Sequence, residues 1–312
     1  MSELPVGVIG VGYLGQHHAR IYGQMAGVRL VGVVDPSAQQ AETVARANGC
    51  AVFPDVGRLA KEVRAVSIVA PTQRHHEVAL ECLRAGLDVL LEKPMTVTLE
   101  QADALIAEAD RRRAILQIGH LERFNSAILA IRPHLTQPRF IEAHRLGPFV
   151  ERGADVSVVL DLMIHDIDLV LGLVRSPVKE IRAAGAAVVS PRIDIANARI
   201  EFVNGCTANI TASRISPERL RKIRIFQSDS YLSVNYQTQE AMLFRRVTNA
   251  QGWPEIVPEA VHVEKEEPLK AELISFVQAV TQRSTPVVSG RDGREALRVA
   301  LEVTDIIERS GP

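Results

Sequence analysis

The chain has 312 residues, 46% of them hydrophobic and 23% charged, with a formal net charge of -1 at pH 7 and a pI of about 6.8. A charge so close to neutral excludes a general basic surface, so we expect neither nucleic acid nor an anionic membrane as a partner. The apolar content is enough for two hydrophobic cores rather than one. No uncharged apolar stretch is long enough to predict a membrane span.

The three cysteines, Cys50, Cys82 and Cys206, are far apart and show no Cys-x-x-Cys spacing. That pattern argues against a disulfide framework and against a zinc site. The first residues contain no basic leader and no cleavage site, so we expect a cytoplasmic protein. The histidine pairs at 17–18 and 75–76 have poor geometry for metal ligands, and we expect no metal.

Residues 1–121 alternate short runs rich in Val and Ile with helical patterns, which is typical of a parallel sheet covered by helices on both faces. The expected strands lie near residues 6–10, 29–35, 65–70, 88–93 and 114–119. A helix is expected after Thr98, which has capping-box spacing to Gln101. We therefore predict an α/β protein with a doubly wound domain at 1–121 and a second α/β domain at 122–312.

Gly10-x-Gly12-x-x-Gly15 follows the first expected strand and opens the first expected helix, as a dinucleotide-binding turn requires. Asp35 ends the second strand, at the distance from which a carboxylate reaches the adenosine ribose and repels a 2′-phosphate. The alternative is a sharp turn without a ligand, with Asp35 only capping the next helix. We predict a Rossmann domain that binds NAD rather than NADP, through Gly10, Gly12, Tyr13, Leu14, Gly15 and Asp35.

Lys93 stands at the end of an apolar strand and is followed by Pro94. Ligands of open parallel sheets lie at the carboxyl ends of the strands, so Lys93 is expected to project toward a nicotinamide. A surface lysine at a strand exit is the alternative.

The segment 155–174 predicts an apolar helix with one polar stripe. At 100° per residue, its polar residues at positions 157, 161, 165 and 168 share a narrow wedge of the helix. Buried polar groups need partners, and a substrate with many hydroxyl groups could supply them. The alternative is a structural network in which Asp161 fixes a core histidine and Asp168 caps a neighbouring element.

Beyond residue 178 the chain predicts an open, mostly antiparallel sheet, with a hairpin turn at Asn204-Gly205. A partner subunit is the expected cover for its bare face, so we predict a homodimer or homotetramer formed through this sheet. Two helical patterns close the chain.

The glycine motif, the "PTQRHH" sequence at 71–76, the "EKP" sequence at 92–94 and Asp161-x-x-x-His165 together resemble the glucose-fructose oxidoreductase and inositol dehydrogenase (Gfo/Idh/MocA) family. The resemblance implies a nicotinamide-dependent oxidoreductase acting on sugars, inositols or related polyols. It also implies that the last helix, about 290–310, returns to the first domain. By the same resemblance, the nicotinamide ribose is lined by Pro71, Thr72 and His75, and the reacting carbons are bordered by Glu92 and Lys93. The family often has Thr-Pro-Asn where this chain has Ala70-Pro71-Thr72.

From these residues we predict which side chains carry out the oxidation of an alcohol. Histidine has an ordinary pKa of about 6.5, which suits a proton acceptor near neutral pH, so His165 is the expected base and Asp161 would orient its ring. Lys93 would stabilise the developing alkoxide. The roles of Lys93 and His165 could also be exchanged.

Two segments resemble a subgroup of the family, the UDP-N-acetylglucosamine 3-dehydrogenases. They are the "GHLERFN" sequence at 119–125 and the longer segment at 212–236. Arginine binds phosphates through paired N–H groups, and a basic cluster lies at Arg214, Arg219, Arg221, Lys222 and Arg224. The alternative for that cluster is a charged strand edge that blocks aggregation. We predict oxidation at C3 of a UDP-N-acetylhexosamine, with substrate contacts from Lys93, Arg123, Asn125, Asp161, His165 and Arg214. A dehydrogenase of a free sugar or inositol, and a non-catalytic NAD-binding sensor, are the alternative functions.

Overall fold

The computed structural model describes residues 3–150 and 156–310. The chain divides into two compact units, Met1–His120 with Leu269–Glu295, and Leu121–Pro268 with Ala296–Pro312. The first unit thus includes a segment that follows the strands of the second unit in the chain. No helix in the described ranges is both long and apolar enough to cross a membrane.

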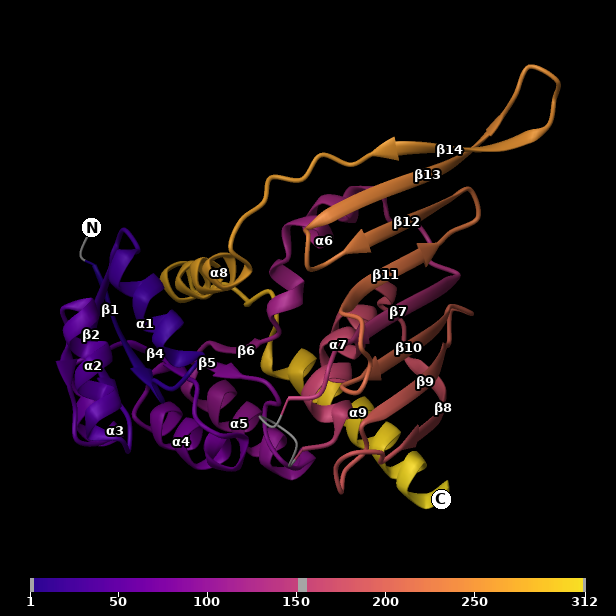
Figure 1. The fold of residues 1–312 in the computed structure, drawn as a ribbon. Coiled ribbons are helices and arrows are strands. Elements are labelled where there is room, and N and C mark those ends of the chain that lie inside the picture. Colours follow the sequence, from indigo (N-terminus) through magenta and orange to yellow (C-terminus); the bar gives the residue numbers. More distant parts are fainter. Residues whose placement is uncertain (1–2, 151–155, 311–312) are drawn as a thin grey trace. The chain divides into compact units, whose positions relative to one another are not determined.

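A parallel six-stranded sheet forms the centre of the first unit (Figure 1), in the order β3-β2-β1-β4-β5-β6. Its strands are β1 (Leu4–Ile9), β2 (Val28–Val34), β3 (Ala51–Val52), β4 (Ala65–Ile68), β5 (Asp88–Glu92) and β6 (Leu116–Gly119). The order reverses between β1 and β4, and in such sheets the ligand-binding crevice lies at the carboxyl ends of those strands. The predicted doubly wound fold is confirmed.

The helices of this unit connect its strands or follow the second unit in the chain. They are α1 (Gly15–Gln24), α2 (Ala38–Asn48), α3 (Val56–Leu59), α4 (Thr72–Arg84), α5 (Leu99–Arg112), α8 (Pro268–Gln282) and the start of α9 (Gly290–Ser310). The Thr98 hydroxyl accepts the Gln101 N–H at the start of α5, as predicted from their spacing. Fully buried aliphatic side chains on β1 and β4 form the core between the helix layers.

The second unit is built on an eight-stranded sheet in the order β14-β13-β12-β11-β7-β10-β9-β8 (Figure 1). Its strands are β7 (Phe140–Leu146), β8 (Val178–Ala186), β9 (Ile195–Phe202), β10 (Thr207–Ser213), β11 (Leu220–Phe226), β12 (Ser230–Asn235), β13 (Glu240–Thr248) and β14 (Pro254–Ala260). All neighbours are antiparallel except β7 and β10. The predicted turn joins β9 to β10, with Gly205 at φ 84°. Strands β7 and β14 were not expected from the sequence.

One face of this sheet packs against helices. The short helical elements are η1 (Leu121–Phe124), α6 (Ser126–Ile131), η2 (Arg132–His134) and η3 (Val159–Met163), and the longer ones are α7 (Ile164–Val174) and the remainder of α9. Buried residues of α7, α9 and alternate sheet positions share one hydrophobic core. Element η3 is a π-helical turn, so the expected uniform spacing of 100° per residue is wrong before Ile164.

Candidate active site

The glycine turn after β1 is shaped by positions that accept no side chain. Gly10 has φ 83°, and a Cβ there would lie 2.8 Å from the Val69 carbonyl. A Cβ on Gly15 would lie 1.9 Å from the Gly10 oxygen, whereas one on Gly12 would have no atom within 4 Å. The fold therefore requires Gly10 and Gly15, while Gly12 leaves open space where a pyrophosphate can approach the backbone. Tyr13 and Leu14 complete the turn, and Tyr13 is exposed.

Asp35 follows β2 and faces this turn. Its Oδ2 accepts the Val11 N–H at 2.8 Å, and its Oδ1 accepts the Ser37 N–H at 2.9 Å. The carboxylate thus supports both the glycine turn and the approach to α2. An ionised carboxylate has about four acceptor positions, so two remain for ribose hydroxyls.

His75 links the loops that follow β4 and β5. Pro71 precedes α4 and Thr72 begins it, and the His75 ring nitrogens lie 2.8 Å from the Ala70 oxygen and 2.9 Å from the Pro94 oxygen. Burial lowers the pKa of His75, although both carbonyls favour its protonated form. The ring therefore fixes the positions of two loops at the carboxyl edge of the sheet.

Glu92 ends β5 at the same edge, and Lys93 follows it directly. Glu92 is buried, its Oε1 lies 3.4 Å from His18 Nε2, and its Oε2 accepts the Lys93 N–H at 3.3 Å. A Cβ on Gly119 of β6 would lie 2.9 Å from this carboxyl group. His18, on α1, was not expected as part of this site; its position just beyond Gly15 was the available signal.

In the second unit, Asp161 lies in the π-helical turn and His165 lies in the first turn of α7, both half-buried. Asp168 instead holds Arg123, whose Nε and Nη2 donate to its carboxylate oxygens at 2.6 and 2.9 Å. Asp168 of the predicted polar stripe therefore has an ion-pair partner inside the protein, and it does not act as the helix cap of the alternative interpretation.

A buried ionic network that joins α7 to β7 and η1 was not expected from the sequence. Arg145 on β7 donates to Asp166 at 2.7 Å and to Glu122 at 2.9 Å, and its guanidinium lies 5.4 Å from the Tyr236 ring centroid. Burial raises the pKa of Asp166 against the opposing effect of Arg145. Asp166 lies outside the polar stripe, and β7 was not predicted, so no pattern linked these residues.

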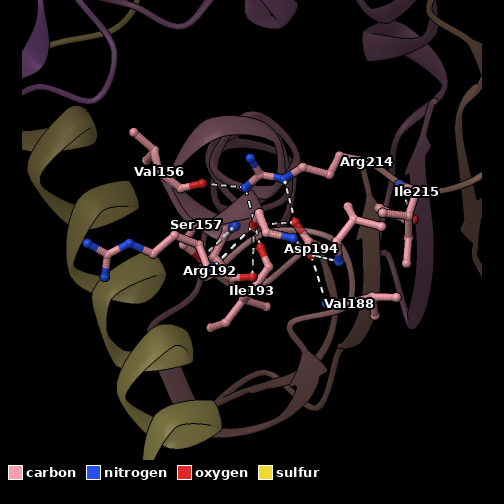
Figure 2. Close-up of polar contacts among 12 residues, drawn as sticks. Val156, Ser157, Val188, Arg192, Ile193, Asp194, Arg214 and Ile215 are labelled. Atoms are coloured by element: carbon pink, nitrogen blue, oxygen red, sulfur yellow. Dashed lines mark hydrogen bonds and ion pairs between the residues drawn. The ribbon is translucent and has the colours of Figure 1, made fainter. Parts of the chain in front are cut away.

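Asn125 and Arg214 also have internal partners. Asn125 accepts the Ala127 N–H at 3.1 Å as the cap of α6. Figure 2 shows Arg214 between Asp194, 3.6 Å from its Nε, and the Val156 carbonyl, to which Nη2 donates. As substrate contacts, Arg123, Asn125 and Arg214 stay predictions.

A cavity of about 360 Å³ opens within the second unit. Its polar lining residues are Arg145, Asp161, Arg214, Arg219, Arg221 and Gln237. The cavity therefore combines one candidate catalytic residue with several cationic side chains.

A turn that requires glycine at positions 10 and 15 and leaves open space at Gly12, with a carboxylate facing it after β2 and a lysine just after β5, suits a nicotinamide dinucleotide and defines an NAD-dependent oxidoreductase. Residues 4–120 match the family described as the oxidoreductase family with an NAD-binding Rossmann fold, and residues 118–233 match the GFO/IDH/MocA C-terminal domain. The chain belongs to the GFO/IDH/MocA oxidoreductase family, and the predicted family, fold class and NAD cofactor are confirmed.

Full-length relatives share this organisation. The chain is 40% identical to a UDP-N-acetylglucosamine 3-dehydrogenase of Acidithiobacillus ferrooxidans, over 99% of this chain and 98% of the relative. A solved structure of that enzyme superposes with a TM-score of 0.93 over 99% of each chain. A scyllo-inositol 2-dehydrogenase of Bacillus subtilis is 26% identical over 98% of this chain and 94% of its own.

Proposed function

We propose that the protein oxidises the C3 hydroxyl of UDP-N-acetylglucosamine to a ketone with NAD. The observation that carries this proposal is the 40% identity, over nearly all of both chains, to an enzyme named for that reaction. The cavity at Asp161 supports it, because its arginines suit a substrate with two phosphates. A free inositol has no such group.

The hydroxyl proton and the developing alkoxide each have a candidate partner among the residues described above. NAD, when bound, supplies the hydride acceptor. His165 accepts the proton of the C3 hydroxyl, and Asp161 orients the imidazole and stabilises its charged form. Lys93 stabilises the developing alkoxide. An exchange of the roles of Lys93 and His165 is the alternative mechanism.

The test compares NADH formation, followed by absorbance, with UDP-N-acetylglucosamine, N-acetylglucosamine and myo-inositol. An aminotransferase is added to remove the ketone. Turnover with the UDP-sugar alone supports the proposal. Turnover with a free sugar or myo-inositol would instead favour the activity suggested by the inositol dehydrogenase relatives, and tight NAD binding without turnover of any substrate would favour a sensor.

We also propose a homo-oligomer formed through the face of the eight-stranded sheet opposite its core. Phe140, Phe226, Tyr231 and Phe244 lie directly across from one another on four adjacent strands, with neighbouring ring centroids 4.3 to 5.9 Å apart. Such an aromatic row suits a protein interface. Light scattering after chromatography tests this, because Tyr231→Glu should convert the oligomer to a monomer. A cytoplasmic location, in which the free thiols Cys50, Cys82 and Cys206 stay reduced, is part of the proposal.

A further inference from the structure

The cavity in the second unit is lined by the end of β7, the π-helical turn and the segment entering β11. Two of its four arginines are already neutralised inside the protein. Arg145 is held by Asp166 and Glu122, and Arg214 is held by Asp194. Their positive charges are therefore balanced without a ligand.

Arg219 and Arg221 differ from that pair. Among the described residues, neither side chain has a hydrogen-bond or ion-pair partner, and both are exposed. Arg221 pairs directly with Arg145 across β11 and β7, and both side chains lie on the helix-covered face with Ile223 and Ala143. Like charges directly opposite each other in a sheet are unfavourable.

The surroundings of Arg221 also disfavour its positive charge. Although Arg221 as a residue is exposed, partial burial of its guanidinium and the neighbouring Arg145 lower its pKa, against the opposing effect of Glu122 and Asp166. An anion in the cavity would offset the repulsion between the Arg221 and Arg145 guanidinium groups. A diphosphate suits two adjacent guanidinium groups, since each can donate paired N–H groups to phosphate oxygens.

We propose that Arg219 and Arg221 bind the diphosphate of the nucleotide sugar in this cavity, which leaves the attached sugar for the helix that carries Asp161 and His165. This inference rests on the proposed function, and it assigns the diphosphate to different arginines from the predicted contact Arg214. The nucleotide sugar and NAD both contain a diphosphate, so the experiment must separate these two sources.

The experiment measures binding of UDP, inorganic pyrophosphate and NADH to the full chain by calorimetry. Arg219→Gln and Arg221→Gln should each weaken UDP binding about tenfold or more, because each removes charge-assisted hydrogen bonds. Lys222→Gln is the matched control: it removes one positive charge from the adjacent position, whose side chain points to the opposite face of β11. It should change UDP binding less than twofold, and NADH binding should be unchanged in all three variants.

Arg221→Lys provides a second variant, which keeps the charge but loses the paired N–H groups, and should give an intermediate affinity. Failure of the wild-type chain to bind UDP would overturn the inference, as would unchanged UDP affinity in both glutamine variants. Loss of NADH affinity together with UDP affinity would overturn it by assigning the arginines to the cofactor.

Turnover separates this inference from the proposed function. If UDP binding depends on the two arginines but UDP-N-acetylglucosamine is not oxidised, the diphosphate site stands and the proposed reaction fails. If that substrate is oxidised with the same KM by wild type and both glutamine variants, the reaction stands and the diphosphate site is wrong.

Discussion

Arg214 and Asp194 form a buried ion pair with 3.6 Å between Arg214 Nε and Asp194 Oδ1 (Figure 2). Arg214 Nη2 also donates to the carbonyls of Ile193 and Val156. Val156 lies shortly before the π-helical turn that carries Asp161. The pair therefore joins the end of β10 and the approach to β9 to the segment that enters a candidate catalytic helix.

Arg214→Ala should lower the free energy of unfolding by about 3 kcal/mol, because it leaves a buried carboxylate without its cationic partner. Urea denaturation measures this change. Arg192→Ala is the control: Arg192 is an exposed arginine near the same loop, and its loss should cost no more than about 0.5 kcal/mol. Equal stability of the two variants would contradict a structural role for Arg214.

Asp194 should make stability depend on pH in the acid range. Burial alone would raise its pKa, but the Ser190 hydroxyl and the backbone N–H groups of Ser190, Val188 and Val189 outweigh burial and lower the pKa to about 2. A lowered carboxyl pKa stabilises the folded state above the unfolded value of about 3.9, and this contribution is lost as pH falls toward 2.

Asp194→Asn should therefore remove a pH-dependent stabilisation of about 2 kcal/mol at pH 7. Unfolding of wild type and variant, compared between about pH 7 and pH 2, measures it. The difference between the two proteins should shrink below about pH 4, and a difference that stays constant over this range would contradict the assigned pKa.

Gly12→Ala should leave stability unchanged and weaken NAD binding, because the new methyl group meets no protein atom within 4 Å and enters the space expected for the pyrophosphate. Gly15→Ala should instead destabilise the fold, since its Cβ would lie 1.9 Å from the Gly10 oxygen. Thermal unfolding together with NADH titration distinguishes the two effects. Normal NADH affinity in a folded Gly12→Ala variant would argue against this turn as the pyrophosphate site.

The pH dependence of kcat/KM distinguishes the two possible proton acceptors. If His165 is the base, His165→Asn should lower kcat/KM by about a hundredfold or more and abolish the acidic limb near its ionisation. Lys93→Met should then retain that limb at a reduced rate. The reverse pattern would assign the proton to Lys93.

The first unit could be predicted well because its signals are local. Short windows of sequence show the alternation of strands and helices. They also show Gly10 and Gly15, where a larger side chain would clash with the backbone. The capping of α5 by Thr98 also depends only on near neighbours.

The second unit was less predictable because its polar residues pair across long stretches of sequence. Arg123 meets Asp168 45 residues later, and neither position alone reveals the partner. The π-helical turn at Val159–Met163 also changes the helical phase, so a uniform spacing could not place Asp161. Arg145 belonged to a strand that the sequence pattern did not reveal.

The proposed reaction removes a hydride from C3 of a UDP-linked sugar. The most direct measurement incubates the protein with NAD and UDP-N-acetylglucosamine deuterated at C3, and determines the mass of the NADH formed. We expect that the NADH carries the deuterium and that the sugar product is a ketone at C3. Unlabelled NADH, or no NADH from a chain that binds both ligands, would contradict it.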